Sequence, residues 1–330
     1  MNELRLNIAT NSWVIIAPGR QGKPYDFDKE EKSGSVPGFD EDCPFCPGNS
    51  SKLEKIIYEK KDEEGWINRV VSNKYPALTP EGSSKRTSKG LYFTMENYGK
   101  QEIIIESPKH NDDISKLSEK HAYSLIDTYF LRYTEVMKDN KNMFCIIFKN
   151  HGKTAGTSLM HPHTQLAVTS VVPQHVRLRE REAQRYFDKF GSCVFCDIII
   201  EEYRTKKRII YENDTFICFV PYFAEVPYEV WIMPKRHEAD FGSMSENEKA
   251  GLADSLRKIL KKIRKELQNP DYNFIIHSAA KYKAGEPQVH WYLQIKPRTT
   301  IDAGFEIGTG IPINPAVPEE NANMLKINQG

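Results

Sequence analysis

The sequence predicts an α+β fold that is built twice along the chain, as two antiparallel sheets that each carry one packed helix. Each half of the 330 residues contains a C-x-x-C pair, a strand-like run that ends in histidine, an amphipathic stretch and two more short strand-like runs. The length also suits two domains better than one small module. We therefore expect an N-terminal half over residues 1–175 and a C-terminal half over residues 176–330.

The first half supplies its elements in a clear order. After Cys43-Pro-Phe-Cys46, residues 102–110 form a strand-like run that ends in His110. Apolar residues then recur every three or four positions between residues 115 and 140, which predicts a helix with one core face. The β-branched and aromatic runs at 144–148 and 161–168 are typical of strands.

The second half repeats this order from Cys193-Val-Phe-Cys196 onward. A strand-like run at 229–237 again ends in a histidine. The following helix begins at Ser245, whose capping box uses Glu248, and stops before Pro270. Strand-like runs at 273–277 and 290–295 complete the repeat, and a charged helical segment near 176–190 joins the halves. Polar stretches at 21–42 and 79–90 are predicted loops.

Composition excludes several classes of protein. Lys and Arg number 46 against 45 Asp and Glu, a net charge of +1, so the chain shows no electrostatic footprint for nucleic acid. No apolar run reaches the ~18 residues of a membrane span, and the N-terminus has no signal-peptide pattern. We therefore expect a cytoplasmic protein that binds neither nucleic acid nor membrane.

The cysteine pairs and the histidines predict two metal sites. A C-x-x-C turn presents two thiolates, and tetrahedral zinc needs two further ligands. Neither pair has the βαβ context of a redox motif, and the spacing does not fit a zinc finger. We expect zinc at both sites, although one of them could hold iron instead. The expected ligands of the first site are Cys43, Cys46, His110 and His161, and those of the second are Cys193, Cys196, His237 and His290.

The triplet His161-Pro-His163 predicts a reactive imidazole. Residues i and i+2 of a strand point the same way, so a metal on His161 would restrict the position of His163. An imidazole with one nitrogen held by a hydrogen bond can attack with the other nitrogen. Gln165 follows on the same face as a neutral donor, and upstream Gly156 and Ser158 lie in a small, hydroxyl-rich segment suited to phosphate oxygens. In the second half, Tyr292 replaces the nucleophile.

Taken together, these motifs resemble the galactose-1-phosphate uridylyltransferase family of the histidine-triad superfamily. The resemblance rests on Cys43-Pro-Phe-Cys46-Pro-Gly, Asn73-Lys-Tyr-Pro76, Ser158-Leu-Met-His161-Pro-His163-Thr-Gln165 and residues 304–315. It implies a duplicated histidine-triad-like fold and a homodimer. It also implies that His163 accepts a nucleoside monophosphate while Gln165 and Ser158 bind the transferred phosphoryl group.

The resemblance further implies where the substrate lies. Asn73 and Asn150 match positions that contact the nucleotide. Glu306 and Asn314 match a C-terminal segment that approaches the sugar phosphate, often across the dimer. The expected substrates are therefore a nucleotide sugar and a hexose 1-phosphate.

Three functions remain open at this level. The first is a hexose-1-phosphate uridylyltransferase that converts UDP-glucose and galactose 1-phosphate to glucose 1-phosphate and UDP-galactose through a nucleotidyl-histidine. The second is an adenylyltransferase similar to ADP-glucose phosphorylase, which the stretch from His290 to Ile295 resembles. The third is a zinc-stabilised nucleotide-binding protein without catalysis.

Overall fold

The computed structural model describes residues 1–20 and 36–328, so the loop expected over 21–42 falls mostly outside the described residues. Within these ranges, ten strands form one mainly antiparallel sheet in the order β10-β11-β12-β14-β13-β8-β9-β7-β4-β3. Its first-half strands are β3 (Ile56–Asp62), β4 (Gly65–Ser72), β7 (Gly99–Ile105), β8 (Phe144–His151) and β9 (His163–Thr169). Its second-half strands are β10 (Ile209–Glu212), β11 (Phe216–Phe219), β12 (Val230–Pro234), β13 (Tyr272–His277) and β14 (Tyr292–Pro297).

The strand order shows the duplication directly. Reading inward from each edge, β3-β4-β7-β9-β8 and β10-β11-β12-β14-β13 follow the same path through the chain. The expected α+β class with antiparallel half-sheets is confirmed. The two half-sheets are continuous, because β8 pairs with β13, with Asn150 opposite Asn273 and Phe148 opposite Ile275. Each half would otherwise leave an unpaired edge strand at this point.

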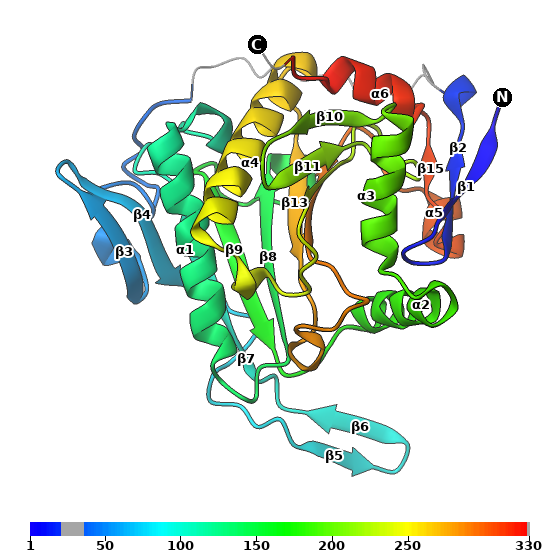
Figure 1. The fold of residues 1–330 in the computed structure, drawn as a ribbon. Helices are drawn as coiled ribbons and strands as arrows, with labels where there is room; N and C mark the ends of the chain where they lie inside the picture. Colours follow the sequence, from blue (N-terminus) through cyan, green and yellow to red (C-terminus); the bar gives the residue numbers. More distant parts are fainter. Residues whose placement is uncertain (21–35, 329–330) are drawn as a thin grey trace.

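One face of the sheet is covered by two long helices, α1 (Glu119–Met137) and α4 (Glu246–Glu266) (Figure 1). They occupy the two predicted helical stretches with somewhat shorter bounds. The capping box between Ser245 and Glu248 is present. Lys249 of α4 donates to Asp127 of α1 at 2.7 Å, so the two helices also contact each other. Both bury apolar side chains in the largest core cluster.

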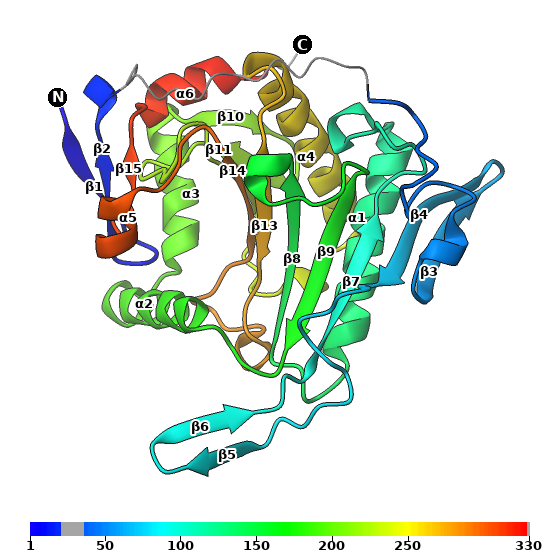
Figure 2. The ribbon, with the colours of Figure 1, turned by 180° about the vertical axis from the view of Figure 1, so that it is seen from behind.

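The opposite face is covered unequally (Figure 2). Helix α3 (Val194–Thr205) packs on the second half-sheet, where Phe195 and Ile198 contact the cluster that contains Trp231 and Tyr292. Helix α2 (Gln174–Phe190) follows the β9 strand and leads into α3. On the first half-sheet the corresponding apolar cluster is small and is built from the loop that carries Cys43 and Cys46. The first half therefore keeps its face open near β8 and β9.

The remaining elements lie outside the main sheet. A three-stranded sheet of β1 (Glu3–Asn7), β2 (Ser12–Ile16) and β15 (Ile313–Asn314) lies beside α5 (Gly304–Thr309) and α6 (Pro318–Leu325). A hairpin of β5 (Arg86–Lys89) and β6 (Tyr92–Met95) projects from the body. The loop expected over 79–90 is thus wrong for its last residues, because Gly90, at φ +61°, allows the tight turn of the hairpin. No helix in the described ranges could span a bilayer.

Candidate active site and metal centres

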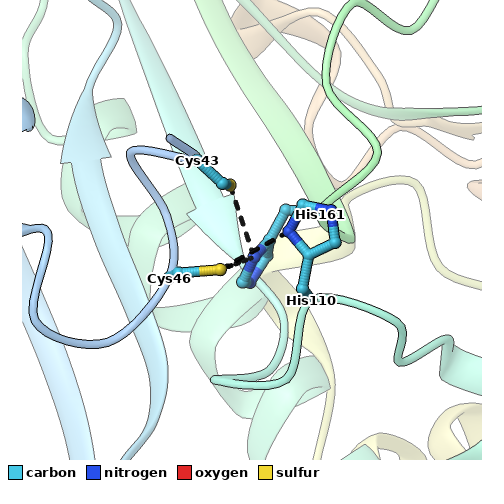
Figure 3. A group of neighbouring side chains, drawn as sticks. All are labelled: Cys43, Cys46, His110 and His161. Carbon is cyan, nitrogen blue, oxygen red and sulfur yellow. Dashed lines mark hydrogen bonds between the residues drawn. The ribbon is translucent and has the colours of Figure 1, made fainter. Parts of the chain in front are cut away.

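The first predicted metal group is assembled from three separate segments. Cys43, Cys46, His110 and His161 are all buried, and their ligand atoms lie within 4.8 Å of one another. The Cys46 sulfur lies 3.4 Å from His110 Nδ1 and 3.6 Å from His161 Nδ1 (Figure 3). Cys43 Sγ lies 3.7 Å from His161 Nδ1. The structure thus brings the four predicted residues together with thiols and imidazoles facing one another.

The second predicted group has the same arrangement. Cys193, the N-cap residue of α3, and Cys196 in its first turn meet His237 and His290 within 4.8 Å. The Cys196 sulfur lies 3.3 Å from His237 Nδ1 and 3.5 Å from His290 Nδ1. The α3 helix, which closes the face of the second half, is therefore also attached to the sheet through this group.

Both groups fit a tetrahedral zinc ion. Ligand atoms bonded to zinc at about 2.0–2.3 Å lie roughly 3.3–3.8 Å apart at the corners of a tetrahedron, as the S···N separations here do. In each group one histidine also presents Nδ1 to the sulfurs and donates through Nε2, from His161 to the Ser107 carbonyl and from His290 to the Pro234 carbonyl. Such outer hydrogen bonds fix the tautomer that a metal needs. Two sites that can hold metal ions are therefore present.

His163 lies at the start of β9 with one nitrogen held and the other free. Its Nδ1–H donates to the His161 carbonyl at 2.9 Å. No described residue forms a hydrogen bond with Nε2. Burial, reinforced by the Lys149 ammonium, lowers the pKa of His163 to about 4, so the ring is neutral at pH 7. A neutral imidazole with a free Nε2 lone pair is the form that attacks an electrophile.

Gln165 lies two residues further along β9 on the same open face. Its Oε1 accepts a hydrogen bond of 3.1 Å from Gln101 Nε2 on β7. This contact orients the side chain and leaves the two N–H groups of Gln165 for a ligand. Gln165 can therefore donate to a phosphoryl oxygen beside His163 without transferring a proton.

The segment after β8 is shaped by glycines and by one carboxylate. Gly152 has φ +85°, and a Cβ there would collide with Asp271, whose carboxylate accepts from Thr154 N at 2.8 Å. Gly156 has φ +89° and lies next to the Asn150 side chain. A Cβ added to Gly156 would be 3.8 Å from Asn150 Nδ2. Ser158 follows as an exposed hydroxyl. Gly156 and Asn150, two of the predicted binding residues, thus lie side by side.

A cavity of about 410 Å³ begins at Asn150 and extends across the junction of the two halves. Its lining combines apolar side chains of β8 and β13 with amide and cationic groups. Asn273 Nδ2 donates to Asn150 Oδ1 at 2.9 Å and so fixes the amide at the mouth of the cavity. Lys296 and Arg298 complete the lining, where Lys296 is paired with Glu225 at 2.5 Å and Arg298 is exposed. The cavity can therefore take a polar or anionic ligand next to the β9 site.

Asn73 lies at the opposite side of the site, directly after β4. Its backbone N–H donates to Gln101 O at 3.1 Å, and its side chain accepts from Tyr75 N at 2.9 Å. Gln101 thus joins the Asn73 turn to Gln165. The structure thus places Asn73, directly after β4, one strand away from Gln165 and His163 of β9, with β7 between them.

The two predicted C-terminal residues lie elsewhere in the chain. Asn314 is fully buried and donates to Ala224 O, while its Oδ1 accepts from Ala316 N. Glu306 accepts from Ala303 N and caps α5. Figures 1 and 2 show β15 and α5 beside β1 and β2, away from β9. Within one chain the structure therefore does not bring Glu306 or Asn314 to His163.

Two residues that sequence reasoning did not select also contribute to the site. Phe45 packs edge-on against both His161 and His163, with ring centroids 5.9 and 5.5 Å apart. These contacts connect the loop of Cys43 and Cys46 to the His163 ring. Gln101 orients Gln165, as described above. In the sequence, only the place of Phe45 inside the C-x-x-C motif and the place of Gln101 next to Glu102 could have pointed to these residues, and both indications are weak.

The equivalent position of the second half is filled by its own side chains. Tyr292 stacks between His277 and Trp231, at centroid distances of 4.6 and 4.4 Å. Gln294, the counterpart of Gln165, accepts from His277 Nε2 at 2.8 Å and donates to Glu229 at 2.7 Å. In this half a tyrosine therefore stands at the position of His163, and the side chains of Tyr292 and Gln294 are engaged with their neighbours.

Comparison with known proteins places this duplicated site in a family. The model of the N-terminal domain of galactose-1-phosphate uridyl transferase matches residues 1–173, and that of the C-terminal domain matches residues 179–306. The chain belongs to the galactose-1-phosphate uridylyltransferase family. The resemblance inferred from the sequence motifs is confirmed, and so is the assignment to nucleotidyltransferases.

Individual relatives in and around this family cover nearly the whole chain. ADP-glucose phosphorylase from Arabidopsis thaliana is 33% identical over 98% of this chain and 92% of its own length. Galactose-1-phosphate uridylyltransferase from Thermotoga maritima is 27% identical over 99% and 98%. A crystal structure of the Arabidopsis phosphorylase with bound ADP-glucose superposes with a TM-score of 0.85 at 31% identity, covering 100% of both chains. A solved uridylyltransferase gives 0.76 at 26% identity, covering 98% and 97%.

Proposed function

We propose that this chain is a hexose-1-phosphate nucleotidylyltransferase that works by double displacement through a nucleotidyl-His163. The observation that carries the proposal is the placement of buried His163 beside half-buried Gln165, with Nδ1 held by the His161 carbonyl and Nε2 without a hydrogen bond to any described residue. The leading reaction is UDP-glucose plus galactose 1-phosphate to glucose 1-phosphate plus UDP-galactose, which the family models support.

The first displacement forms a P–N bond and breaks a P–O bond. His163 Nε2 attacks the α-phosphorus of the nucleotide sugar, and the electron pair of the broken bond leaves with the hexose 1-phosphate. In the second displacement a phosphate oxygen of the acceptor attacks the same phosphorus and releases the imidazole. Asn73 and Asn150 would contact the nucleotide, while Ser158 and the Gly156 turn would bind the transferred phosphoryl group.

Gln165 suits transfer between phosphates because it is a neutral donor. A sugar phosphate has a second pKa of about 6, so it leaves without a proton from the enzyme. Gln165 would bind the phosphoryl oxygens while charge redistributes, and Gln101 would keep its amide oriented. The cavity that begins at Asn150 would take the sugar phosphate.

The metals in this proposal are structural zinc ions at both four-residue groups. The first is held by Cys43, Cys46, His110 and His161, and the second by Cys193, Cys196, His237 and His290. A bound divalent cation supplies the charge that holds these thiols as thiolates. Its consequence for chemistry is indirect, because His161 and Phe45 then fix the surroundings of His163.

A second candidate is an adenylyltransferase that uses ADP-glucose and inorganic phosphate. It is supported by the 33% identity to ADP-glucose phosphorylase and by Tyr292 in place of a second histidine. Both candidates use the same chemistry at His163 and differ in the base and the acceptor.

The deciding experiment is incubation with UDP-glucose or ADP-glucose labelled at the α-phosphate, followed by denaturing gel analysis. We expect acid-labile, base-stable label on wild-type protein from one of the two donors and none on His163→Gly. Galactose 1-phosphate and inorganic phosphate are then added separately to ask which one discharges the label. If neither donor labels the wild-type chain, the proposal is wrong and the non-catalytic alternative gains support.

The assembly that we propose is a cytoplasmic homodimer. The described cysteines are all free, which suits a reducing compartment. Phe305 and Ile307 of α5 are exposed, Ile307 by 76%, and would be covered by a second copy. Light scattering on purified protein would determine the mass, and a monomer would exclude a role for Glu306 or Asn314 across a dimer.

A further inference from the structure

A buried polar pair lies directly beneath the nucleophile strand, on the helix-covered side of the sheet. Lys149 of β8 and Glu106 after β7 are 2% and 1% exposed, and Lys149 Nζ lies 2.6 Å from Glu106 Oε1. Thr164 Oγ1 donates to the same carboxylate oxygen at 2.6 Å, and Tyr129 of α1 bonds Thr164 at 2.7 Å. A buried pair of this kind is weak evidence for stability, since removing two charges from water is costly.

The contacts of this pair fall on three consecutive residues around the nucleophile. The Glu106 N–H donates to the Pro162 carbonyl at 3.1 Å. Lys149 Nζ reaches the His163 carbonyl at 3.4 Å, and Glu106 holds the Thr164 side chain. A shift of this backbone moves the His163 ring on the other face because His163 is part of the segment, and it also changes the Nδ1 hydrogen bond to the His161 carbonyl.

The backbone of Glu106 is held by further hydrogen bonds. Its carbonyl oxygen accepts from Asn68 Nδ2 and from His121 Nε2, each at 2.8 Å. Asn68 also accepts from Ser124 of α1. The support of the 162–164 segment therefore extends to β4 and α1, two elements that are fixed in the main core.

The second repeat provides an internal comparison for two members of this network. Gln165 lies opposite Phe148, and Gln294 lies opposite Ile275. One residue along each strand, Lys149 and Thr164 therefore correspond to Ile276 and Leu293. Both counterparts are apolar and buried, at 2% and 0% exposure. The same strand geometry thus forms without polar groups where no nucleophile is present.

Glu106 has no counterpart at all. Ile103 lies opposite Gln165 and Trp231 opposite Gln294, so Ile105 corresponds to Met233. The carbonyls of Ser107 and Pro234 accept from the equivalent ligands His161 and His290, so these two residues also correspond. One extra residue, Glu106, therefore stands in the first repeat between these matched positions.

We propose that Lys149 and Glu106 form a positioning pair that holds the 162–164 segment, and with it Nε2 of His163, in the geometry that nucleotidyl transfer requires. The inference rests on the proposed function. It assigns the pair to the reaction because the fold, as the second repeat shows, is built without it. Neither side chain faces the substrate side of the sheet, so the pair acts through the backbone of β9.

The test is the double variant Glu106→Gln/Lys149→Met, assayed by exchange of label between a nucleotide sugar and its hexose 1-phosphate. We expect a folded protein with unchanged metal content. The kcat of exchange should fall about tenfold or more while KM stays within about threefold, because misplacement of an attacking atom affects the chemical step. Lys149→Arg should retain more activity than the double variant. Ile276→Met, the matched change in the second repeat, should leave exchange unaltered.

The outcomes separate the two proposals. If wild-type protein shows no exchange with any nucleotide sugar, the proposed function is refuted. If wild type and double variant exchange equally well, only the positioning role is refuted. If the fall in kcat is matched by a loss of bound metal, the pair serves the metal loop and the inference is also overturned. Should the double variant not fold, Thr164→Val decides: a kcat equal to that of wild type overturns the inference, and a fall of about threefold or more supports it.

Discussion

The strands β9 and β14 occupy the same position in their repeats but carry different side chains at the position of His163. Each follows a histidine of a candidate metal site, His161 or His290, and each has a glutamine at the fourth position after it. On β9 the intervening residue is His163 with a free nitrogen, whereas on β14 Tyr292 is stacked between two aromatic rings. The comparison teaches that the metal group and the strand geometry are the common scaffold. We expect one side chain and the covering of the face to decide whether this scaffold can react.

The largest difference should come from substituting His163 and, separately, Tyr292 at the matched position. His163→Gly should lower turnover by at least about a thousandfold, since it removes the nucleophile, while metal content and unfolding temperature stay near wild type. Free imidazole in the gap should restore part of the cleavage of the nucleotide sugar. Tyr292→Phe, at the matched position, should leave turnover unchanged. Substantial turnover of His163→Gly without imidazole would rule out covalent catalysis at this residue.

The two glutamines should also differ in their effects. Gln165→Ala should lower kcat by about a hundredfold, because it removes the donor to the transferred phosphoryl group. Gln294→Ala removes hydrogen bonds to His277 and Glu229 and should lower stability instead. Steady-state kinetics and thermal unfolding of both variants provide the measurement. Equal effects of the two substitutions on kcat would contradict the assignment of chemistry to one half.

The metal groups predict a smaller but separable contrast. Cys43→Ser and Cys193→Ser should each lose about one zinc equivalent per chain and lower the unfolding temperature. Only the change at Cys43 should also slow the chemical step, because Phe45 and His161 of that site contact His163. Metal analysis of protein purified without chelator supplies the reference. A wild-type content near zero would refute both metal assignments.

The smallest effect concerns the pH dependence of stability, through His277 beside Tyr292 in the second half. Burial and the neighbouring Arg179 guanidinium hold the pKa of His277 well below 6.5. The unfolded chain then binds this proton while the folded chain does not. His277 should therefore cost about 1.4 kcal/mol of stability per unit as the pH falls below 6.5, with no such loss above it. His277→Asn, which introduces the residue found at the matched position 150, should flatten the unfolding free energy between pH 5 and 6.5. An unchanged slope would show that His277 is charged in the fold.

Much of this asymmetry could be predicted from residue order. The repeated C-x-x-C pairs, the His161-Pro-His163 triplet and the loss of histidine at Tyr292 are local patterns with a direct chemical meaning. Two amphipathic stretches likewise located α1 and α4, because helical periodicity is a local property.

Other features depend on partners that are distant in sequence. The pairing of β8 with β13 joins residues more than a hundred positions apart. The sequence of each strand alone is equally consistent with an edge strand of a separate sheet. The charge of Lys149 suggests an exposed position in its strand. Its ion pair with Glu106 instead allows this side chain to be buried. The family resemblance implied a sugar-phosphate role for Asn314, whereas within one chain its amide bonds the backbone of residues 224 and 316. Such roles follow from tertiary contacts and not from residue type.

The β8–β13 junction has a consequence for how such a chain could arise. A single repeat would present β8 as a bare edge, and an antiparallel edge can pair with a second copy of itself around a two-fold axis. Two identical subunits joined in this way would carry two equal reaction centres. Fusing them in one polypeptide makes the junction intramolecular and independent of concentration. It also allows the halves to mutate separately, so that one centre could be closed while the other kept its nucleophile.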